Sequence, residues 1–302
     1  MKKTIFLWVL ALTLSLASGC SGGEASLCEL TAAPNPSEAS GKEVRLQAGS
    51  GEISCVEPPS VMVCRIVDGA GEGSLLLAEL ERDGLISTGS GGVFRLAVED
   101  IPVFLDGEEV SPADLEDGMA VEISWDGMVM ESFPGQLGKV YSLTAYSLGT
   151  EQNPGGGYYD LCGFYLKVLE DLWEVDSGLN SGIVQLGLDL SQAPGGLTDH
   201  EKSALAWRFG ELHGLSVLTG TWDELADQGY IQREGLIWED GLFFSLGPCE
   251  EAEGETYSLP VLRFEAQKWR SGLGAYFFCD CTAVWSECGT WSDYTVGAEA
   301  IA

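Results

Sequence analysis

Apolar and polar residues alternate over short segments between residues 44 and 148, and most of these segments end at a glycine-containing turn. Alternation with a period of two predicts strands with one buried face. Asp106-Gly107 is a strong hairpin signal, and Asp126-Gly127 predicts a second hairpin in which the chain returns along residues 128–133. The predicted strands are residues 61–67, 93–98, 103–105, 121–125, 128–133 and 139–146.

Two further segments complete this half of the chain. Residues 74–80 fit either a returning strand or a short helix, and residues 111–115 fit one helical turn with proline at its first position. Five or six strands with one short helix predict a small, closed OB-like β-barrel. We assign residues 44–148 to this all-β domain.

The periodicity changes in the second half. Residues 149–157 are rich in glycine and predict a linker, and beyond it the apolar residues of segment 161–173 recur with helical spacing. Thr198 and Thr221 each begin a capping box with the glutamate three residues later, so each predicts the start of a helix. Gly214 predicts the end of the first of these two helices.

The remaining signals in this half are strands. Residues 183–190 alternate, and four apolar positions of segment 274–285 are expected to share one buried face: Phe277, Cys279, Cys281 and Trp285. The other predicted strands are 236–238 and 242–244, which form a hairpin, 261–268 and 291–296. Helices followed by strands predict an α+β domain over residues 158–302, with the helices packed on an antiparallel sheet.

The first 20 residues differ from the rest of the chain. Lysines at positions 2 and 3, about a dozen apolar residues and small residues at 17–19 make up the three regions of a secretory signal. The apolar run is shorter than the roughly 20 residues of a spanning helix. Residues 16–20, Leu-Ala-Ser-Gly-Cys, resemble the lipobox of bacterial lipoproteins. The resemblance implies that residues 1–19 are a signal peptide and that Cys20 becomes the lipidated first residue.

This resemblance also implies a location. Diacylglyceryl and palmitate chains on Cys20 would anchor the protein to the cell membrane on its extracellular side, and more than one chain is needed for stable anchoring. A signal peptide without lipid and a short buried helix are the alternatives. Residues 20–43 are mostly serine, glycine, glutamate, alanine and proline, so we expect a flexible spacer between the membrane and the domains.

The charge of the chain excludes one class of partner. The sequence has 302 residues with 15 Lys+Arg and 47 Asp+Glu, and 45% of its residues are hydrophobic, which suffices for a folded core. Because residues 1–19 carry two lysines and no acidic residue, the rest holds 13 basic and 47 acidic side chains, a formal charge of −34. Such a body repels phosphates, so we expect no nucleic-acid binding.

Nine cysteines raise the question of disulfides. An exported protein can form them, and the favoured pair is Cys55 with Cys64, although free thiols are the alternative. Cys279 and Cys281 would lie roughly 7 Å apart in a strand, too far to bond each other. No cysteine spacing matches a zinc site, so we predict neither a metal nor a cofactor.

Four groups of turn and strand residues in the first half are characteristic together: 103–107, 114–119, 125–127 and 131–134. They resemble an uncharacterised OB-like domain of lipoproteins from Firmicutes, over roughly residues 60–147. Residues 263–276 are similar to the C-terminal part of uncharacterised lipoproteins of gut Clostridia. Both resemblances imply a fold and a location, and neither carries an activity.

No catalytic motif stands out. Residues 68–74 are rich in glycine, but Ser74 stands where the G-x-G-x-x-G pattern of a dinucleotide loop has its last glycine. A hairpin loop is therefore the better interpretation. His200 lies in a capping box and His213 near a helix end, and both fit structural roles. Neither a nucleophile motif nor a calcium loop occurs. A pair of acidic residues for glycoside hydrolysis cannot be placed from sequence.

The candidate binding residues lie in the last quarter of the chain. Three of the few basic residues occur within eight positions there, with aromatic residues nearby, a composition typical of binding hot spots. The predicted binding residues are Arg263, Lys268, Trp269, Arg270, Tyr276 and Trp291. The alternative is that the aromatic residues belong to the core.

These observations predict a membrane-anchored extracellular lipoprotein that binds an envelope ligand or a protein partner and is not an enzyme. A carboxylate-dependent hydrolase of envelope polymers or glycans is the alternative.

Overall fold

The computed structural model describes residues 59–80, 91–147, 160–249, 261–285, 291 and 293–302. The chain divides into two compact units, residues 1–55 and 56–302, and all described residues belong to the second. The predicted signal peptide (1–19), the lipidation site Cys20, the spacer (20–43) and the linker (149–157) lie outside the described residues.

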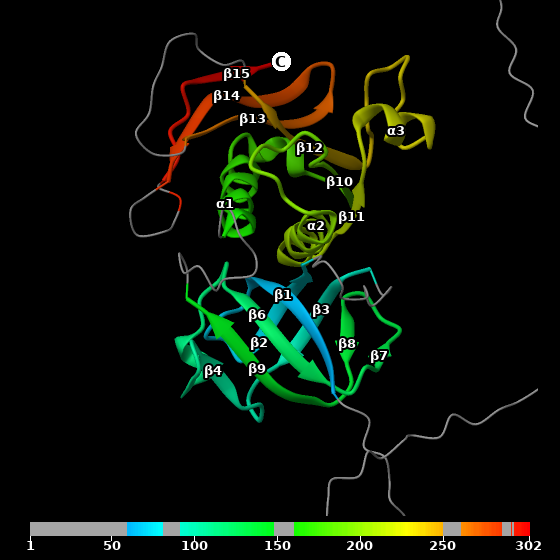
Figure 1. Cartoon of the computed structure of the whole chain (residues 1–302). Coiled ribbons are helices and arrows are strands. Elements are labelled where there is room, and N and C mark those ends of the chain that lie inside the picture. Colours follow the sequence, from blue (N-terminus) through cyan, green and yellow to red (C-terminus); the bar gives the residue numbers. More distant parts are fainter. Residues whose placement is uncertain (1–58, 81–90, 148–159, 250–260, 286–290, 292) are drawn as a thin grey trace, which may run out of the picture. The chain divides into compact units, whose positions relative to one another are not determined.

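Strands dominate the described part of the chain and form two sheets, with few helices (Figure 1). The first sheet has the strand order β5-β4-β9-β6-β1-β2-β3-β8-β7. Its strands are β1 (Ser60–Asp68), β2 (Ser74–Glu79), β3 (Val93–Ala97), β4 (Val103–Leu105), β5 (Glu108–Val110), β6 (Ala120–Trp125), β7 (Val129–Met130), β8 (Gly135–Leu137) and β9 (Val140–Tyr146). Within the described ranges β5 and β7 end the sheet and do not pair with each other, so the strand order does not close into a ring.

Turn chemistry predicted one hairpin of this sheet and missed the other. Asp106 and Gly107 both have positive φ (50° and 91°) and join β4 to β5, as expected. Asp126 instead accepts hydrogen bonds from the backbone N–H groups of Met128 (3.0 Å) and Lys139 (2.8 Å). The expected hairpin after Trp125 is therefore wrong: β6 pairs with β1 and β9, and β7 pairs with β8.

For residues 74–80, which fitted either a strand or a short helix, the structure has the strand. Residues 74–79 form a strand, and the glycine-rich residues between β1 and β2 make a hairpin loop. Gly69 has φ +94°, and a Cβ there would collide with the Ser74 carbonyl. Residues Pro112–Asp114 form a single 3-10 turn with Ser111 in a capping box.

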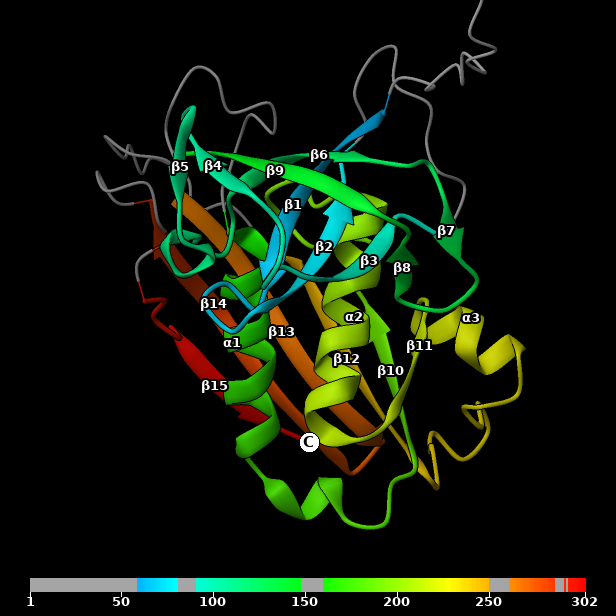
Figure 2. The same ribbon diagram turned by 90° about the horizontal axis from the view of Figure 1, so that it is seen from below.

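The second sheet has the order β11-β10-β12-β13-β14-β15, and α1 and α2 cover the face that is turned toward the first sheet (Figures 1 and 2). Its elements are α1 (Leu161–Glu174), β10 (Gln185–Asp189), α2 (Asp199–His213), β11 (Ser216–Thr219), α3 (Trp222–Asp227), β12 (Gly241–Pro248), β13 (Val261–Ser271), β14 (Gly274–Val284) and β15 (Ala298–Ile301). Both predicted capping boxes are present, and Gly214 ends α2 with φ +64°.

This sheet is mixed, which corrects the expected antiparallel sheet. Strands β12 to β15 are antiparallel, but β10 is parallel to both β11 and β12. A strand followed by a helix and a further strand returns in the same direction, and β10–α2–β11 is such a unit. The predicted hairpin at residues 236–244 is also wrong. Strand β12 begins at Gly241, and its partners are β10 and β13.

A β-bulge changes which residues of β14 are buried. Asp280 has φ +51°, and the register with β13 shifts between Phe264 and Ala266. Beyond this extra residue the alternation is reversed, so Phe278 and Cys281 face the core while Cys279 is half-exposed. The expected single face with Phe277, Cys279, Cys281 and Trp285 is therefore wrong.

The three larger apolar clusters of the described residues hold these layers together. One fills the interior of the first sheet, and the largest lies between α1, α2 and the second sheet and also includes Leu76 and Val93 from β2 and β3. The third lies on the opposite face of the second sheet, where Leu225 of α3 packs near Phe243 and Trp269. The helices α1 and α2 therefore share buried contacts with both sheets.

No disulfide joins the cysteines of the described residues to one another: Cys64, Cys162, Cys249, Cys279 and Cys281. The expected disulfide between Cys55 and Cys64 is wrong, because Cys64 is a free thiol buried in β1.

Candidate functional site: a buried ion pair and the groove beside α2

Lys268, one of the predicted binding residues, is inside the protein. Its side chain is 0% exposed, and Nζ donates hydrogen bonds to the carbonyl oxygens of Trp173 (2.9 Å), Val175 (2.7 Å) and Asp176 (3.4 Å). A cation is favoured at the C-terminus of a helix, and Lys268 caps α1 in this way. Burial lowers its pKa to about 8. The role of Lys268 is structural, and the expectation that it lies on a binding surface is wrong.

The other predicted binding residues do not form one surface. Arg270 donates to the carbonyl oxygens of Leu179 (2.8 Å) and Ser181 (2.6 Å), and the Trp269 ring meets the Trp222 ring edge to face, 5.6 Å between centroids. Tyr276 donates to Glu299 at 2.6 Å. Trp291 packs against the core beside Phe164, and Arg263 is half-exposed on β13. Ligand binding by Arg263, Trp269, Arg270, Tyr276 and Trp291 stays a prediction.

Both histidines take part in structural contacts. His213 stacks on Trp173, with 3.8 Å between the ring centroids, and Nε2 lies 2.9 Å from Glu170 Oε1. His200 Nδ1 lies 3.0 Å from the carbonyl oxygen of Glu79 and so joins α2 to β2.

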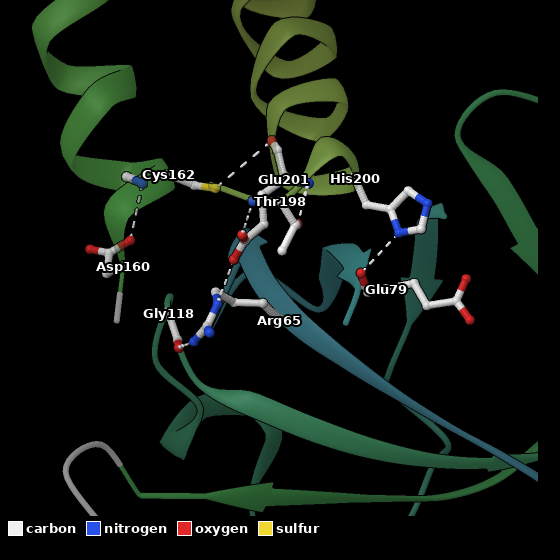
Figure 3. Close-up of polar contacts among 9 residues, drawn as sticks. Arg65, Glu79, Gly118, Asp160, Cys162, Thr198, His200 and Glu201 are labelled. Atoms are coloured by element: carbon white, nitrogen blue, oxygen red, sulfur yellow. Dashed lines mark hydrogen bonds and ion pairs between the residues drawn. The ribbon is translucent and has the colours of Figure 1, made fainter. Parts of the chain in front are cut away.

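A buried ion pair links β1 of the first sheet to α2 (Figure 3). Arg65 of β1 points at the first turn of α2, where Nε donates to Glu201 Oε1 at 2.7 Å. The two side chains are 5% and 8% exposed. Arg65 Nη1 also donates to the Gly118 carbonyl at 2.9 Å, and Glu201 Oε2 accepts from the Thr198 backbone N–H at 2.8 Å. The capping box that begins α2 therefore also positions the carboxylate that neutralises Arg65.

A second acidic residue lies beside this pair, at the start of α1. Asp160 has φ 51° and caps the helix by accepting from the Gly163 N–H at 3.1 Å. Burial raises the pKa of Asp160 to about 6, and the nearby Asp117 carboxylate adds to the rise. Burial also raises the pKa of Asp117, which accepts from the Ala70 N–H at 3.0 Å. Asp117 therefore raises the pKa of Asp160, whereas the charges that shift the pKa of Asp117 are those of Asp68, Glu72 and Arg208.

The later turns of α2 are tied to the first sheet by exposed or partly buried charges. Arg95 Nη2 donates to both carboxylate oxygens of Glu211, at 2.7 and 2.6 Å, and Arg208 Nε lies 2.8 Å from Asp68 Oδ2. The Arg95 guanidinium also lies over the Trp207 ring, 4.8 Å from its centroid. Together with Arg65–Glu201, these contacts fix α2 along its whole length.

A groove runs along α2 beside these contacts, and Trp207 and Glu211 also line it. Its volume is about 640 Å³. We call it the α2–β11 groove; Ala206, Trp207 and Gly210 of α2 form one wall, Val217 and Thr219 of β11 form the other, and Phe133 closes one side. A second hollow of about 300 Å³ shares Ser203 and Thr219 with it and adds three acidic residues: Asp189, Asp199 and Glu224. The groove is mainly apolar and leads to an acidic end.

The close approach of α2 to β11 depends on one glycine. A Cβ on Gly210 would lie 2.6 Å from the Leu215 carbonyl oxygen and 2.7 Å from Val217 Cγ2. The groove is therefore formed by a helix that lies directly on the edge strand.

Sequence reasoning missed the groove because its walls are far apart in the chain. Phe133 comes from the β7–β8 hairpin and is 55% exposed, whereas Trp207 lies on α2. Phe133 was expected at the end of the predicted strand 128–133, and no local signal indicated that it would lie beside Trp207.

The described residues hold no cluster of three or more metal-ligating side chains. None of the helices in the described part of the chain is long and apolar enough to span a membrane. No protein-family model, curated protein or solved structure matches the chain.

Proposed function

We propose that this protein is a lipid-anchored, extracellular binding protein that holds its ligand in the α2–β11 groove. The observation that carries the proposal is the groove itself: about 640 Å³, with Trp207 and Phe133 as aromatic walls and α2 fixed by buried and half-buried ion pairs. Binding sites are concave and mainly apolar, with a few positioned polar groups and little movement on binding. The proposal replaces the predicted binding residues of the last quarter as the primary site.

The pairing of the first sheet supports an OB-like fold for this half. Strand β8 is parallel to β3, whereas β9, which follows after only two residues, is antiparallel to β6. Strands β6, β1, β2 and β3 lie side by side in this order in the sheet. The segment β8–β9 therefore pairs with both ends of this set, through β9 on β6 and through β8 on β3. We infer a domain of the OB-like lipoprotein type, with its boundaries near residues 44 and 148.

The lipobox resemblance supports the anchor. Diacylglycerol on Cys20 would hold the mature chain at the outer face of the cell membrane, and its acidic surface would keep it away from nucleic acid. Cys20→Ala is expected to release the protein into the medium or to leave an uncut precursor, measured by membrane fractionation and intact mass. Unchanged processing and membrane retention would contradict the anchor.

Binding can be tested on soluble residues 21–302, which contain the whole compact unit 56–302. A thermal-shift panel would hold muropeptides, glycans, phosphate-bearing polymers, calcium and short peptides. A ligand at 100 times its Kd adds about 2.7 kcal/mol of stability. We expect a shift that Trp207→Ala removes and Trp269→Ala keeps. The reverse pattern would restore the site to the last quarter of the chain.

A hydrolase remains the second candidate because of Asp160 and Asp117. A general acid with a raised pKa beside a second carboxyl group is the arrangement that glycosidases use. Asp160 has a pKa of about 6, and Asp117 is the largest charged contributor to the rise. Turnover of a glycan polymer that Asp160→Asn abolishes would favour the enzyme over the binding protein.

A further inference from the structure

Strand β11 presents an open edge along the α2–β11 groove. It ends the second sheet, and only β10 pairs with it among the described residues. Gly220 N–H donates to the Leu188 carbonyl of β10 at 3.1 Å. Because backbone groups alternate along a strand, Leu218 also faces β10, whereas the N–H and C=O groups of Val217 and Thr219 face outward.

This edge lacks the protection that the other sheet edges have. Edge strands are normally kept from pairing with a further strand by charge, proline, bulges or shortness. Among the described edge strands, β5 carries Glu108 and Glu109, β15 carries Glu299, and β7 has only two residues. The sequence of β11 is Ser-Val-Leu-Thr, and its register with β10 is regular. An edge without such protection is a template on which a further strand can pair.

The side-chain environment fits a strand at this edge. Val217 faces α2 and Leu218 faces the α3 side, so the side chains of an added strand would point alternately to these two sides. Those on the α2 side would enter the groove between Trp207 and Phe133. Phe133 is 55% exposed, and Met128 and Met130 of the same hairpin region are 64% and 54% exposed. Methionine side chains adapt to varied apolar partners.

We infer that the occupant of the groove is an extended peptide segment that adds to β11 as a seventh strand and carries a basic residue at one end. The inference rests on the proposal that the groove is the binding site. Backbone hydrogen bonds to Val217 and Thr219 give affinity, and alternate side chains in the groove give selectivity. The basic residue meets the acidic end with Asp189, Asp199 and Glu224, where Lys202 is the only basic residue among the lining residues of that hollow.

A second copy of the chain is the less favoured occupant. The formal charge of the chain is −32, so two copies placed edge to edge repel each other. The same negative charge attracts a basic peptide.

The test uses fluorescein-labelled seven-residue peptides with alternating Val and Thr and one terminal lysine, titrated with residues 21–302 and followed by anisotropy. We expect saturable binding that weakens when glutamate replaces the lysine. Two further peptides would be N-methylated, one at its odd-numbered amides and the other at its even-numbered amides. Because only every second amide faces β11, one of the two should lose binding and the other should keep its Kd within about twofold. Equal effects of the two methylation patterns, or no binding by any peptide, would overturn strand addition.

A matched pair of protein variants tests the edge itself. Val217→Pro removes an outward N–H and should weaken binding about tenfold or more. Ile301→Pro does the same at the other edge of the sheet: Ala302 and Ala275 exchange both backbone hydrogen bonds, so the Ile301 N–H faces away from β14. We expect Ile301→Pro to bind like the parent. If Val217→Pro does not fold, the N-methyl pattern decides, since it leaves the protein unchanged.

Two outcomes separate this inference from the proposed function. A small-molecule shift that depends on Trp207, without any peptide binding, would keep the groove as a site and overturn the peptide assignment. A dimer in sedimentation that Val217→Pro dissociates would assign the edge to a second copy and also overturn it. Failure of the ligand panel and the peptides together would overturn both.

Discussion

At the scale of single residues, the guanidinium of Arg65 depends on its protein partners because it has lost its water. Its Nε–Glu201 contact of 2.7 Å lies between side chains that are 5% and 8% exposed. Separating a buried pair is costly because the remaining charge cannot be hydrated, whereas removing both charges is much less so. The pair therefore adds little to the free energy of unfolding by its attraction, but it restricts which side chains positions 65 and 201 can carry.

Arg65→Met should lower the free energy of unfolding by about 3–5 kcal/mol, because the Glu201 carboxylate would stay buried without a counter-charge. The double variant Arg65→Met/Glu201→Gln should recover a large part of that loss. Urea unfolding followed by tryptophan fluorescence measures both. Equal stability of the single and double variants would contradict a buried, coupled pair.

Asp160 should make stability fall as the pH rises. Its pKa is raised to about 6 in the folded protein, against about 4 in an unfolded chain. Between these values the folded state binds more protons than the unfolded state, so the free energy of unfolding decreases from pH 4 to pH 6. The cause is burial, which penalises the charged carboxylate.

Asp160→Asn should therefore stabilise the protein at pH 7, by on the order of 1–2 kcal/mol, and flatten this pH dependence. Asparagine can keep the cap on Gly163 and tolerates the left-handed backbone at φ 51°. Urea midpoints at several pH values between 4 and 8 give the result. Asp106→Asn, at an exposed turn position with φ 50°, is the matched control for an Asp-to-Asn change on a left-handed backbone.

At the scale of elements, two opposing effects meet at Gly210 in α2. Alanine is favoured over glycine in a helix interior by about 1 kcal/mol. A Cβ here, however, would lie 2.6 Å from a backbone oxygen of the chain leading into β11, which cannot move like a flexible side chain. Overpacking costs about 1–3 kcal/mol, so it should outweigh the gain.

Gly210→Ala should destabilise the protein by about 1–2 kcal/mol and reduce binding in the α2–β11 groove by pushing α2 from the strand. Thermal unfolding and the peptide titration measure the two effects. Ser203→Ala, on the same helix, is the control and should leave stability within about 0.5 kcal/mol. A stabilised Gly210→Ala variant would mean that α2 does not contact the strand this closely.

Elements whose signals are local were predicted well, because adjacent residues determine them. The capping boxes at Thr198 and Thr221 and the helix end at Gly214 involve residues at most four positions apart. The bulge at Asp280 interrupts the hairpin of the consecutive strands β13 and β14, and the alternation of apolar residues in β14 does not indicate it. The parallel pairing of β10 with β12 joins strands that are distant in the chain.

The candidate site was harder to predict than the fold. Lys268 has the composition of a binding residue but faces the end of α1, because residues 268 and 269 point to opposite faces of β13. The sequence shows that side chains alternate between the two faces of the strand, but it does not show which face a helix covers. The groove joins Phe133 to Trp207, which only the packing of the two sheets brings together.

At the scale of the whole molecule, charge opposes compactness. The chain has 47 acidic and 15 basic residues, so we expect the mutual repulsion of carboxylates to exceed the attraction of its ion pairs. Salt screens this repulsion over about 10 Å at 0.1 M.

Raising sodium chloride from low to moderate concentration should therefore increase the stability of residues 21–302 by on the order of 1 kcal/mol, or about 2–4 °C in Tm. Scanning calorimetry at several salt concentrations measures this shift. Potassium chloride at the same ionic strength should give the same result, since screening depends on ionic strength alone. A lower Tm in salt would show that the surface ion pairs outweigh the repulsion.

The buried thiols can report the order in which the layers of the molecule open. Cys64 lies in β1 and Cys162 in α1, and burial raises the pKa of both thiols well above the usual value, so neither reacts with an alkylating reagent in the closed state. Each is modified only when its own layer opens. The relative rates at which a reagent labels the two positions therefore tell whether the sheets separate one after the other or come apart together, without any substitution in the chain.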